Sequence, residues 1–139
     1  MKFMVIVKAN KDSETGVLPT TEQFAEMGKF NEELVKAGVM LMGEGLQDSS
    51  NGARVKFSGK NRSVSNGPFP LTGDLVAGYW IWQCSSLDEA VEWLKRAPFQ
   101  EGEVEIRQIF EAADFGENFT PELREQEARN GRKIAEYAN

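Results

Sequence analysis

The sequence predicts a single domain of the α+β class, and three observations lead to that prediction. The chain has 139 residues, of which 40% are hydrophobic, enough for one modest core. Short apolar runs bounded by glycine, proline and polar residues alternate with segments of helical periodicity. Apolar residues occupy both faces of two predicted strands, which indicates a sheet that is covered on both sides.

The first predicted strand covers residues 2–8. Phe3 and Val5 point one way in it, and Met4 and Ile6 point the other. Residues 10–19 contain glycine and proline among polar residues, so we expect a loop there.

A helix is predicted after this loop. Thr20 is its expected N-cap, with Gln23 three residues later completing a capping box. Gly38 is expected to end the helix. The apolar stripe of this helix consists of Phe24, Met27, Leu34 and Val35.

Strands are predicted next at 39–46, at 53–58 paired with 62–65 as a hairpin, and at 75–84. A second helix should begin at Ser86, with Glu89 in a capping box, and stop before Pro98.

Residues 103–111 alternate as a strand with one wetter face. The run Thr120-Pro121-Glu122 is typical of a helix start and predicts a C-terminal helix.

The resulting order is β-α-β-β-α-β, the ferredoxin-like arrangement, with a hairpin insert and a C-terminal helix. Its two helices can cover only one face of the sheet. Leaving several large apolar side chains of the other face in water would forgo roughly 1.5 to 3 kcal/mol each. We therefore expect a second copy to cover that face as a homodimeric α+β barrel. The alternative is that the C-terminal helix folds back over the open face.

Composition excludes several classes of function. A formal net charge of -6 opposes binding to nucleic acid or to an anionic membrane surface. No apolar run approaches the length of a membrane span, and with the single Cys84 and no evident signal peptide we expect a cytoplasmic protein. The chain has no histidine, which removes the common nucleophile pairs and histidine metal sites. Neither a metal nor a cofactor is expected, since no nucleotide-binding loop is present either.

The stretch that begins Asn66-Gly67-Pro68-Phe69 and runs to Tyr79 resembles the signature of the YCII-related family of the DGPF type. Further blocks resemble the same family in the same order: Phe30-Asn31-Glu32-Glu33-Leu34, Ala37-Gly38-Val39, Gly43-Glu44-Gly45-Leu46-Gln47 and Val104-Glu105-Ile106-Arg107. The resemblance covers residues 1–113 and leaves 114–139 as a C-terminal helical extension.

This resemblance implies a dimeric α+β barrel with small-molecule pockets between subunits, in a family of mostly uncharacterised bacterial proteins. Some members are encoded or fused with sigma factors, and some are thought to use a His/Asp pair for acid/base chemistry. Here histidine is absent, Asn66 replaces the usual Asp, Leu71 the usual Glu and Gly73 the usual Lys. No reaction is therefore transferred to this chain.

Glu44 and Arg107 are candidate functional residues. In a regular strand Glu44 would share a face with Met40, Met42 and Leu46, where apolar neighbours can raise a carboxyl pKa towards that of a useful general base. Arg107 could hold a carboxylate ligand. The structural alternative is that these residues pair with each other, or stay in water.

Aromatic and loop residues complete the candidate site. Asn66, Gly67 and Phe69 could wall a pocket, or could form a rigid turn that positions the next strand. Tyr79 and Trp82 could stack on a planar ligand, or could belong to the core or the dimer interface.

Three hypotheses for function follow. The first is a homodimer that binds a small planar or anionic metabolite, with no assignable reaction. The second is a small-molecule enzyme of lyase, isomerase or monooxygenase-like type with Glu44 as base. The third is an accessory protein of the transcription apparatus.

Overall fold

The computed structural model describes residues 1–138. The chain forms two compact units, Met1–Gln108 and Ile109–Asn139, which are described separately. Within the described residues, no helix is both long and apolar enough to cross a membrane.

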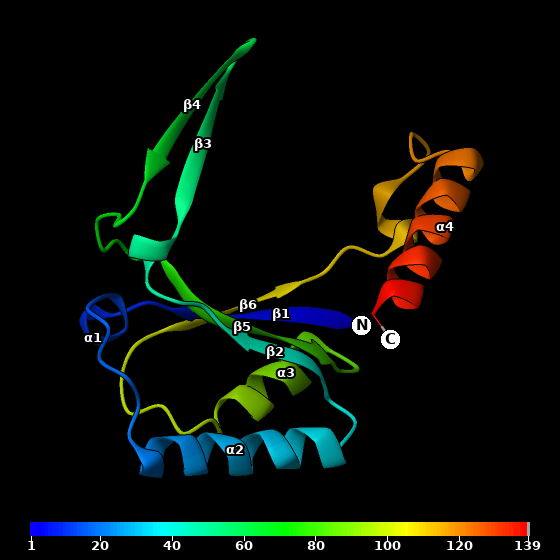
Figure 1. Ribbon diagram of the computed structural model, residues 1–139. Coiled ribbons are helices and arrows are strands. Elements are labelled where there is room, and N and C mark those ends of the chain that lie inside the picture. Colours follow the sequence, from blue (N-terminus) through cyan, green and yellow to red (C-terminus); the bar gives the residue numbers. More distant parts are fainter. Residues whose placement is uncertain (139) are drawn as a thin grey trace. The chain divides into compact units, whose positions relative to one another are not determined.

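The first unit is built on a four-stranded antiparallel sheet. Its strands are β1 (Lys2–Lys8), β2 (Met40–Gly45), β5 (Val76–Gln83) and β6 (Val104–Gln108), in the spatial order β2-β5-β1-β6. This order confirms the predicted ferredoxin-like topology. Two helices, α2 and α3, lie on one face of the sheet (Figure 1).

Helix α2 (Thr21–Lys36) has the predicted N-terminus. Thr20 Oγ1 accepts a hydrogen bond from the backbone of Gln23, and Gln23 Oε1 accepts one from the backbone of Thr20. This capping box satisfies donors that the first helical turn cannot pair internally.

Helix α3 (Leu87–Leu94) is capped by Ser86, whose Oγ accepts from the backbone of Glu89. The Glu89 carboxylate does not complete the predicted capping box. It accepts instead from the backbone and the hydroxyl of Ser85, and these bonds lower the pKa of the Glu89 carboxyl. The cap residue was thus predicted correctly and the partner of Glu89 was not.

The core lies between the sheet and these helices. Phe3 pairs with Trp82 and Val5 with Trp80 across the two central strands, so these four side chains share the helix-facing side. The Trp80 indole also donates a hydrogen bond of 3.0 Å to Asn31 on α2. The other buried members of this cluster are Phe30, Leu34, Val39, Cys84 and Ala90.

The hairpin of β3 (Ala53–Ser58) and β4 (Asn61–Asn66) forms a separate two-stranded sheet, as predicted. It projects from the side of the main sheet that is opposite α2 and α3 (Figure 1). A short 3₁₀ helix, η1 (Ser49–Asn51), connects β2 to the hairpin.

The predicted loop at 10–19 contains one helical turn, α1 (Lys11–Glu14). Asn10 Oδ1 accepts from the backbone of Ser13, and Ser13 Oγ accepts from the backbone of Asn10. This local capping box makes a turn of helix out of a segment whose composition is that of a loop.

The second unit contains η2 (Ala112–Phe115) and the C-terminal helix α4 (Pro121–Tyr137). Thr120 caps α4, and Pro121 occupies its first turn, as the sequence predicts. Phe115 stacks on Phe110, with ring centroids 4.6 Å apart, and meets Phe119 edge-on at 5.4 Å. The apolar side chains of α4 itself, among them Leu123, Ile134 and Tyr137, are exposed.

Replacing Leu34 with alanine tests the assignment of this core. Leu34 is fully buried while its neighbour Val35 is 61% exposed. We expect Leu34→Ala to lower the free energy of unfolding by about 2 to 5 kcal/mol because it leaves a cavity. Val35→Ala, the matched control on the same helix, should change it by less than about 0.5 kcal/mol. Urea titration followed by circular dichroism measures both, and equal losses would place the core elsewhere.

Candidate functional site

The signature loop that follows β4 packs closely against η1. A Cβ atom added to Gly67 would lie 1.6 Å from the carbonyl oxygen of Ser49, so a side chain at position 67 requires this backbone to move. The backbone N–H of Gly67 donates to the carbonyl of Gly52 at 2.9 Å, and that of Phe69 donates to Ser49 Oγ at 2.9 Å. The glycine of the signature therefore permits a close backbone approach that positions Phe69.

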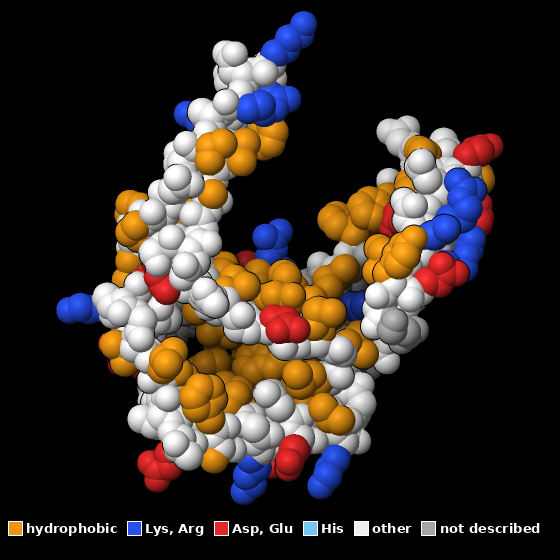
Figure 2. Space-filling view, in the orientation of Figure 1, with side chains coloured by type: hydrophobic (Ala, Val, Ile, Leu, Met, Phe, Trp, Pro, Cys, Tyr) orange, Lys and Arg blue, Asp and Glu red, His pale blue; other side chains and the backbone are white. Residues whose placement is uncertain are grey.

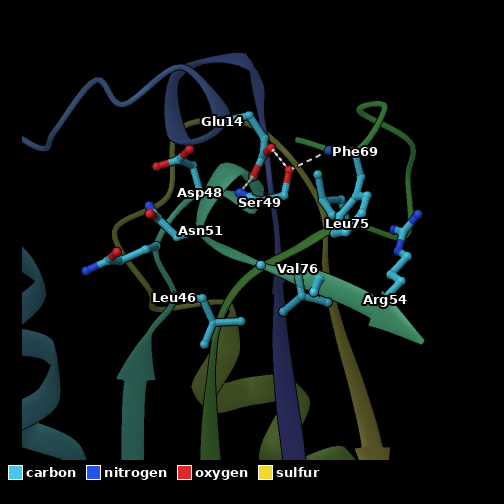
Figure 3. Close-up of a pocket in the computed structure, with 12 residues that line it drawn as sticks. Glu14, Leu46, Asp48, Ser49, Asn51, Arg54, Phe69, Leu75 and Val76 are labelled. Carbon is cyan, nitrogen blue, oxygen red and sulfur yellow. Dashed lines mark hydrogen bonds between the residues drawn. The ribbon is translucent and has the colours of Figure 1, made fainter. Parts of the chain in front are cut away.

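Glu14, at the end of α1, joins the same arrangement. Ser49 donates two hydrogen bonds to its carboxylate, from the backbone N–H at 3.0 Å and from Oγ at 2.6 Å (Figure 3). Because Ser49 Oγ also accepts from Phe69, one serine connects α1, η1 and the signature loop. Charge-assisted hydrogen bonds of this kind fix three segments that are distant in the sequence.

A cavity of about 560 Å³ lies beside these segments, at the base of the hairpin. Leu46, Leu75 and Val76 give it an apolar wall, and the ring of Phe69 also lines it (Figure 3). The other lining residues are Glu14, Gln47, Asp48, Ser49, Asn51, Gly52, Ala53 and Arg54.

Charged groups of both signs border this cavity. The Arg54 guanidinium carbon lies 3.9 Å from the centroid of the Phe69 ring, a cation–π contact that orients the cation beside the pocket. A hydrogen bond from the side chain of Ser50 lowers the pKa of the Asp48 carboxyl, so that this group is an ionised acceptor at neutral pH. The pocket thus offers a fixed cation, the ionised carboxylate of Asp48 and an aromatic ring.

Glu44, Tyr79 and Arg107 lie elsewhere, on the sheet face that α2 and α3 leave uncovered, here called the open face. The strand register aligns two rows of side chains across it: Met42, Ile81, Met4 and Arg107 in one, and Glu44, Tyr79, Ile6 and Glu105 in the next. Apolar groups and Tyr79 occupy the middle of both rows; Arg107 stands at one end of the first row, with Met42 at the other, and glutamates stand at both ends of the second. Figure 2 shows hydrophobic side chains gathered over this side of the sheet.

Glu44 and Arg107 belong to opposite edge strands. With neighbouring strands roughly 4.8 Å apart, three such steps separate them by about 14 Å, so of the two structural alternatives the ion pair between them does not form within the chain. Arg107 approaches Glu105 instead, at 3.9 Å, and Lys8 lies 3.4 Å from the same carboxylate. Both contacts are near the surface and contribute little to stability.

The predicted apolar neighbours of Glu44 also need correction. The register of β2 shifts between Met40 and Met42, so that Met40 pairs with Trp82 and faces the helices. Met42 remains on the open face, where its sulfur accepts a hydrogen bond of 3.7 Å from the Tyr79 hydroxyl.

Trp82 lies on the other side of the sheet from Tyr79. It is fully buried in the core, where its indole nitrogen has no hydrogen-bond partner among the described residues. Asn66 is exposed at the end of β4, opposite Ala53. Of the predicted site residues, the structure brings only Phe69, with Gly67 behind it, to the cavity.

Sequence reasoning missed Glu14, Asp48, Ser49 and Arg54. Glu14 and Ser49 are 35 residues apart, and no local spacing pattern connects them. The alternation of the β3 strand does place Arg54 on the face opposite Val55, but it does not reveal that Phe69 lies beneath it.

Other reactive groups in the described part of the chain offer less. No cluster of carboxylates and Cys84 that could hold a metal ion occurs among residues 1–138. Burial raises the pKa of the Cys84 thiol, so that it is protonated and a weak nucleophile at neutral pH.

A second cavity, of about 410 Å³, lies at the end of the layer between α2 and the sheet. Its walls are largely apolar, with Leu18, Phe24, Met27 and Phe99 among the lining residues. Figure 2 shows a hollow lined by hydrophobic side chains between the sheet and α2.

The antiparallel sheet with two helices on one face and a pocket beside the signature loop defines a small α+β domain protein with a candidate ligand site. The model of the YCII-related domain matches residues 1–113, and the chain belongs to that family. No curated protein matches the chain significantly.

One solved structure with a distant similarity is 5-chloro-2-hydroxyhydroquinone dehydrochlorinase from Burkholderia phenoliruptrix AC1100, in complex with 2,5-dihydroxybenzoquinone. It is 16% identical in sequence, and the alignment covers 79% of this chain and 94% of that one with a TM-score of 0.45.

Gly67→Ala tests the role of the close approach at Ser49. Because the added methyl group would overlap a backbone oxygen, we expect a loss of about 2 kcal/mol or more in the free energy of unfolding. Gly73→Ala is the matched control, since a Cβ there meets nothing within 4 Å. Thermal denaturation measures both, and an unchanged Gly67→Ala variant would show that the loop does not depend on this contact.

Proposed function

We propose that this chain is a homodimeric binding protein for a small planar anion, which enters the cavity at the base of the hairpin. The observation that carries the proposal is the Arg54 guanidinium held over the Phe69 ring at the cavity wall. A guanidinium oriented in this way can donate two parallel hydrogen bonds to a carboxylate.

The other walls favour a flat ligand body. Leu46, Leu75 and Val76 provide apolar surface, and Phe69 provides an aromatic ring. A cavity of about 560 Å³ is within the size range of small-molecule sites. Apolar walls with a few convergent polar groups are the common composition of such sites.

The carboxylates select for a second polar group on the ligand. Asp48 is ionised, and its oxygens can accept from a ligand hydroxyl or amine. Both oxygens of Glu14 already accept hydrogen bonds from Ser49, which supports a positioning role for that residue. A planar acid that also carries a hydroxyl group fits this arrangement.

A second copy of the chain is the proposed cover of the open face. Met4, Ile6 and Ile81 form its apolar centre, and burying each large side chain is worth roughly 1.5 to 3 kcal/mol. Because charges lie only at the ends of the two rows, sheet-to-sheet packing would bury few of them.

A cytoplasmic location also remains part of the proposal, on the basis of the single unpaired Cys84.

Arg54→Gln tests the ligand site. We expect it to weaken the binding of planar carboxylates by about 10- to 100-fold, since a charge-assisted hydrogen bond is worth about 1.5 to 3 kcal/mol. Lys56→Gln is the matched control, because Lys56 lies two residues along the same strand with the same charge and does not line the cavity. Isothermal titration calorimetry with benzoate and hydroxybenzoates, and with benzamide as a neutral counterpart, measures the affinities.

Two results would contradict the proposal. One is that benzamide binds as tightly as the carboxylates, which would show that the negative charge of the ligand does not contribute to binding. The other is that Arg54→Gln and Lys56→Gln weaken binding equally, which would indicate a general effect of charge on the hairpin.

A second candidate function keeps Glu44 as a general base. Glu44 is exposed in the single chain and lies opposite Tyr79 in the register, with no ion pair in the described residues. A second copy on the open face would place this carboxylate at the border of the apolar contact, next to Tyr79, where it could accept a proton from a ligand bound there.

Glu44→Gln separates the two functions. If Glu44 is a base, the variant should lose turnover by about 100-fold or more while the dimer mass and the affinity for the planar acid stay unchanged. Turnover is measured by following bound candidate substrates by mass spectrometry, with Glu103→Gln as an exposed control of equal charge. Turnover that survives Glu44→Gln would rule out this role.

A further inference from the structure

The hairpin of β3 and β4 has a largely apolar face, on which the Arg62 guanidinium lies 4.6 Å from the centroid of the Phe57 ring. Both six-residue strands are exposed along their whole length. Val55 lies opposite Val64, and Phe57 follows two residues along the same face. These three side chains are here called the arm face. Val55 is 49% exposed, Val64 66% and Phe57 68%.

An isolated two-stranded ribbon is marginally stable in water, and packing of a hydrophobic face is what stabilises such ribbons. Figure 2 shows hydrophobic side chains gathered along the hairpin where it stands clear of the sheet. An exposed apolar patch on a projecting element marks an interaction surface.

The hairpin is also the basic part of an acidic chain. Arg54, Lys56, Lys60 and Arg62 all lie between residues 53 and 66, and no carboxylate does. All 22 acidic residues lie elsewhere, together with the remaining 12 of the 16 basic ones. The acidic remainder of another copy of this chain is therefore complementary in charge to the hairpin, and Arg62 stands on the same face as Val55, Phe57 and Val64.

We propose that the hairpin is a docking arm, whose arm face packs on a second copy of this chain that covers the open face. The arm rises from the side of the sheet that carries Met4, Ile6 and Ile81 (Figure 1). A copy seated on that face lies beside the arm. In a two-fold symmetric dimer, each copy then contributes the same open face and the same arm to the contact. This inference rests on the proposed dimer and goes beyond it.

The arm also connects the interface to the ligand site. Arg54 is a residue of β3 and lines the cavity, so docking of the arm restrains the cation that the proposed ligand meets. Ligand affinity and dimer affinity are then coupled, and each should strengthen the other.

Nucleic acid is the competing occupant of a basic ribbon, and the observations favour it less. Arg54 and Arg62 are engaged with the rings of Phe69 and Phe57, and Arg62 also donates to the carbonyl of Gly59 at 2.8 Å. Apolar side chains form no favourable contact with phosphate groups, and the net charge of -6 repels a nucleic acid.

Hydrogen exchange of the full-length protein tests the inference directly. Backbone amides of residues 53–66 should exchange at least about tenfold more slowly at concentrations where the protein is dimeric than where it is monomeric. Analytical ultracentrifugation of the same samples gives the mass at each concentration. Amides of the buried strand β1 serve as the internal reference.

Variants of the arm face provide an independent measurement. Phe57→Ser with Val64→Ser should raise the dissociation constant of the dimer by about tenfold or more, because both side chains lose apolar contacts. Ser63→Ala on the opposite face of the hairpin is the matched control and should leave it unchanged. Near-ultraviolet circular dichroism checks that the tryptophan core of each variant is intact.

The outcomes separate the arm from the dimer. A dimer in which residues 53–66 exchange as fast as in the monomer overturns the docking arm and leaves the proposed dimer standing. A monomer at every concentration overturns both. Protection that appears only when duplex DNA or RNA is added assigns the hairpin to nucleic acid and also overturns the inference.

Discussion

The pairing of β1 with β5 is the constraint on which the remaining structure depends. These two central strands align Phe3 with Trp82 and Val5 with Trp80, and this register sends the aromatic side chains towards the helices. The intervening residues, including Met4 and Ile6, then face the open side. A slip of one residue would exchange the two sets, so the buried aromatics fix the register strongly.

The position of the candidate site follows from where the chain leaves this sheet. After β2 the backbone turns through η1 into the hairpin and returns through the signature loop. Gly67 allows that return to pass against Ser49, and the same serine is held by Glu14. The first role of the signature loop is therefore packing against η1. Phe69 lies at the cavity because its backbone N–H donates to Ser49 in this packed arrangement. Arg54 meets it from the base of the hairpin.

Local signals predicted the elements well where the cause was local. Thr20 with Gln23 fixed the start of α2, and Pro121 after Thr120 that of α4, because capping acts over three or four residues. The same local logic failed where a neighbour competed. Glu89 bonds to Ser85 rather than to its expected partner, and the capping box of Asn10 makes a helical turn in a loop. Of the candidate residues, Phe69 lines the cavity with Gly67 behind it, while the strand order separates Glu44 from Arg107.

The sequence by itself determined the class of fold, the strands with two apolar faces, the absence of histidine and the charge contrast between hairpin and remainder. Each of these depends on composition or on the period of side chains along one element. Only the tertiary structure decided which residues meet: Glu14 with Ser49 across 35 positions, and Phe69 with Ser49 across 20. The physical reason is that periodicity describes the faces of an element, whereas contacts between distant segments depend on strand order, on the register shift at Met40 and on the turn that brings two backbones together.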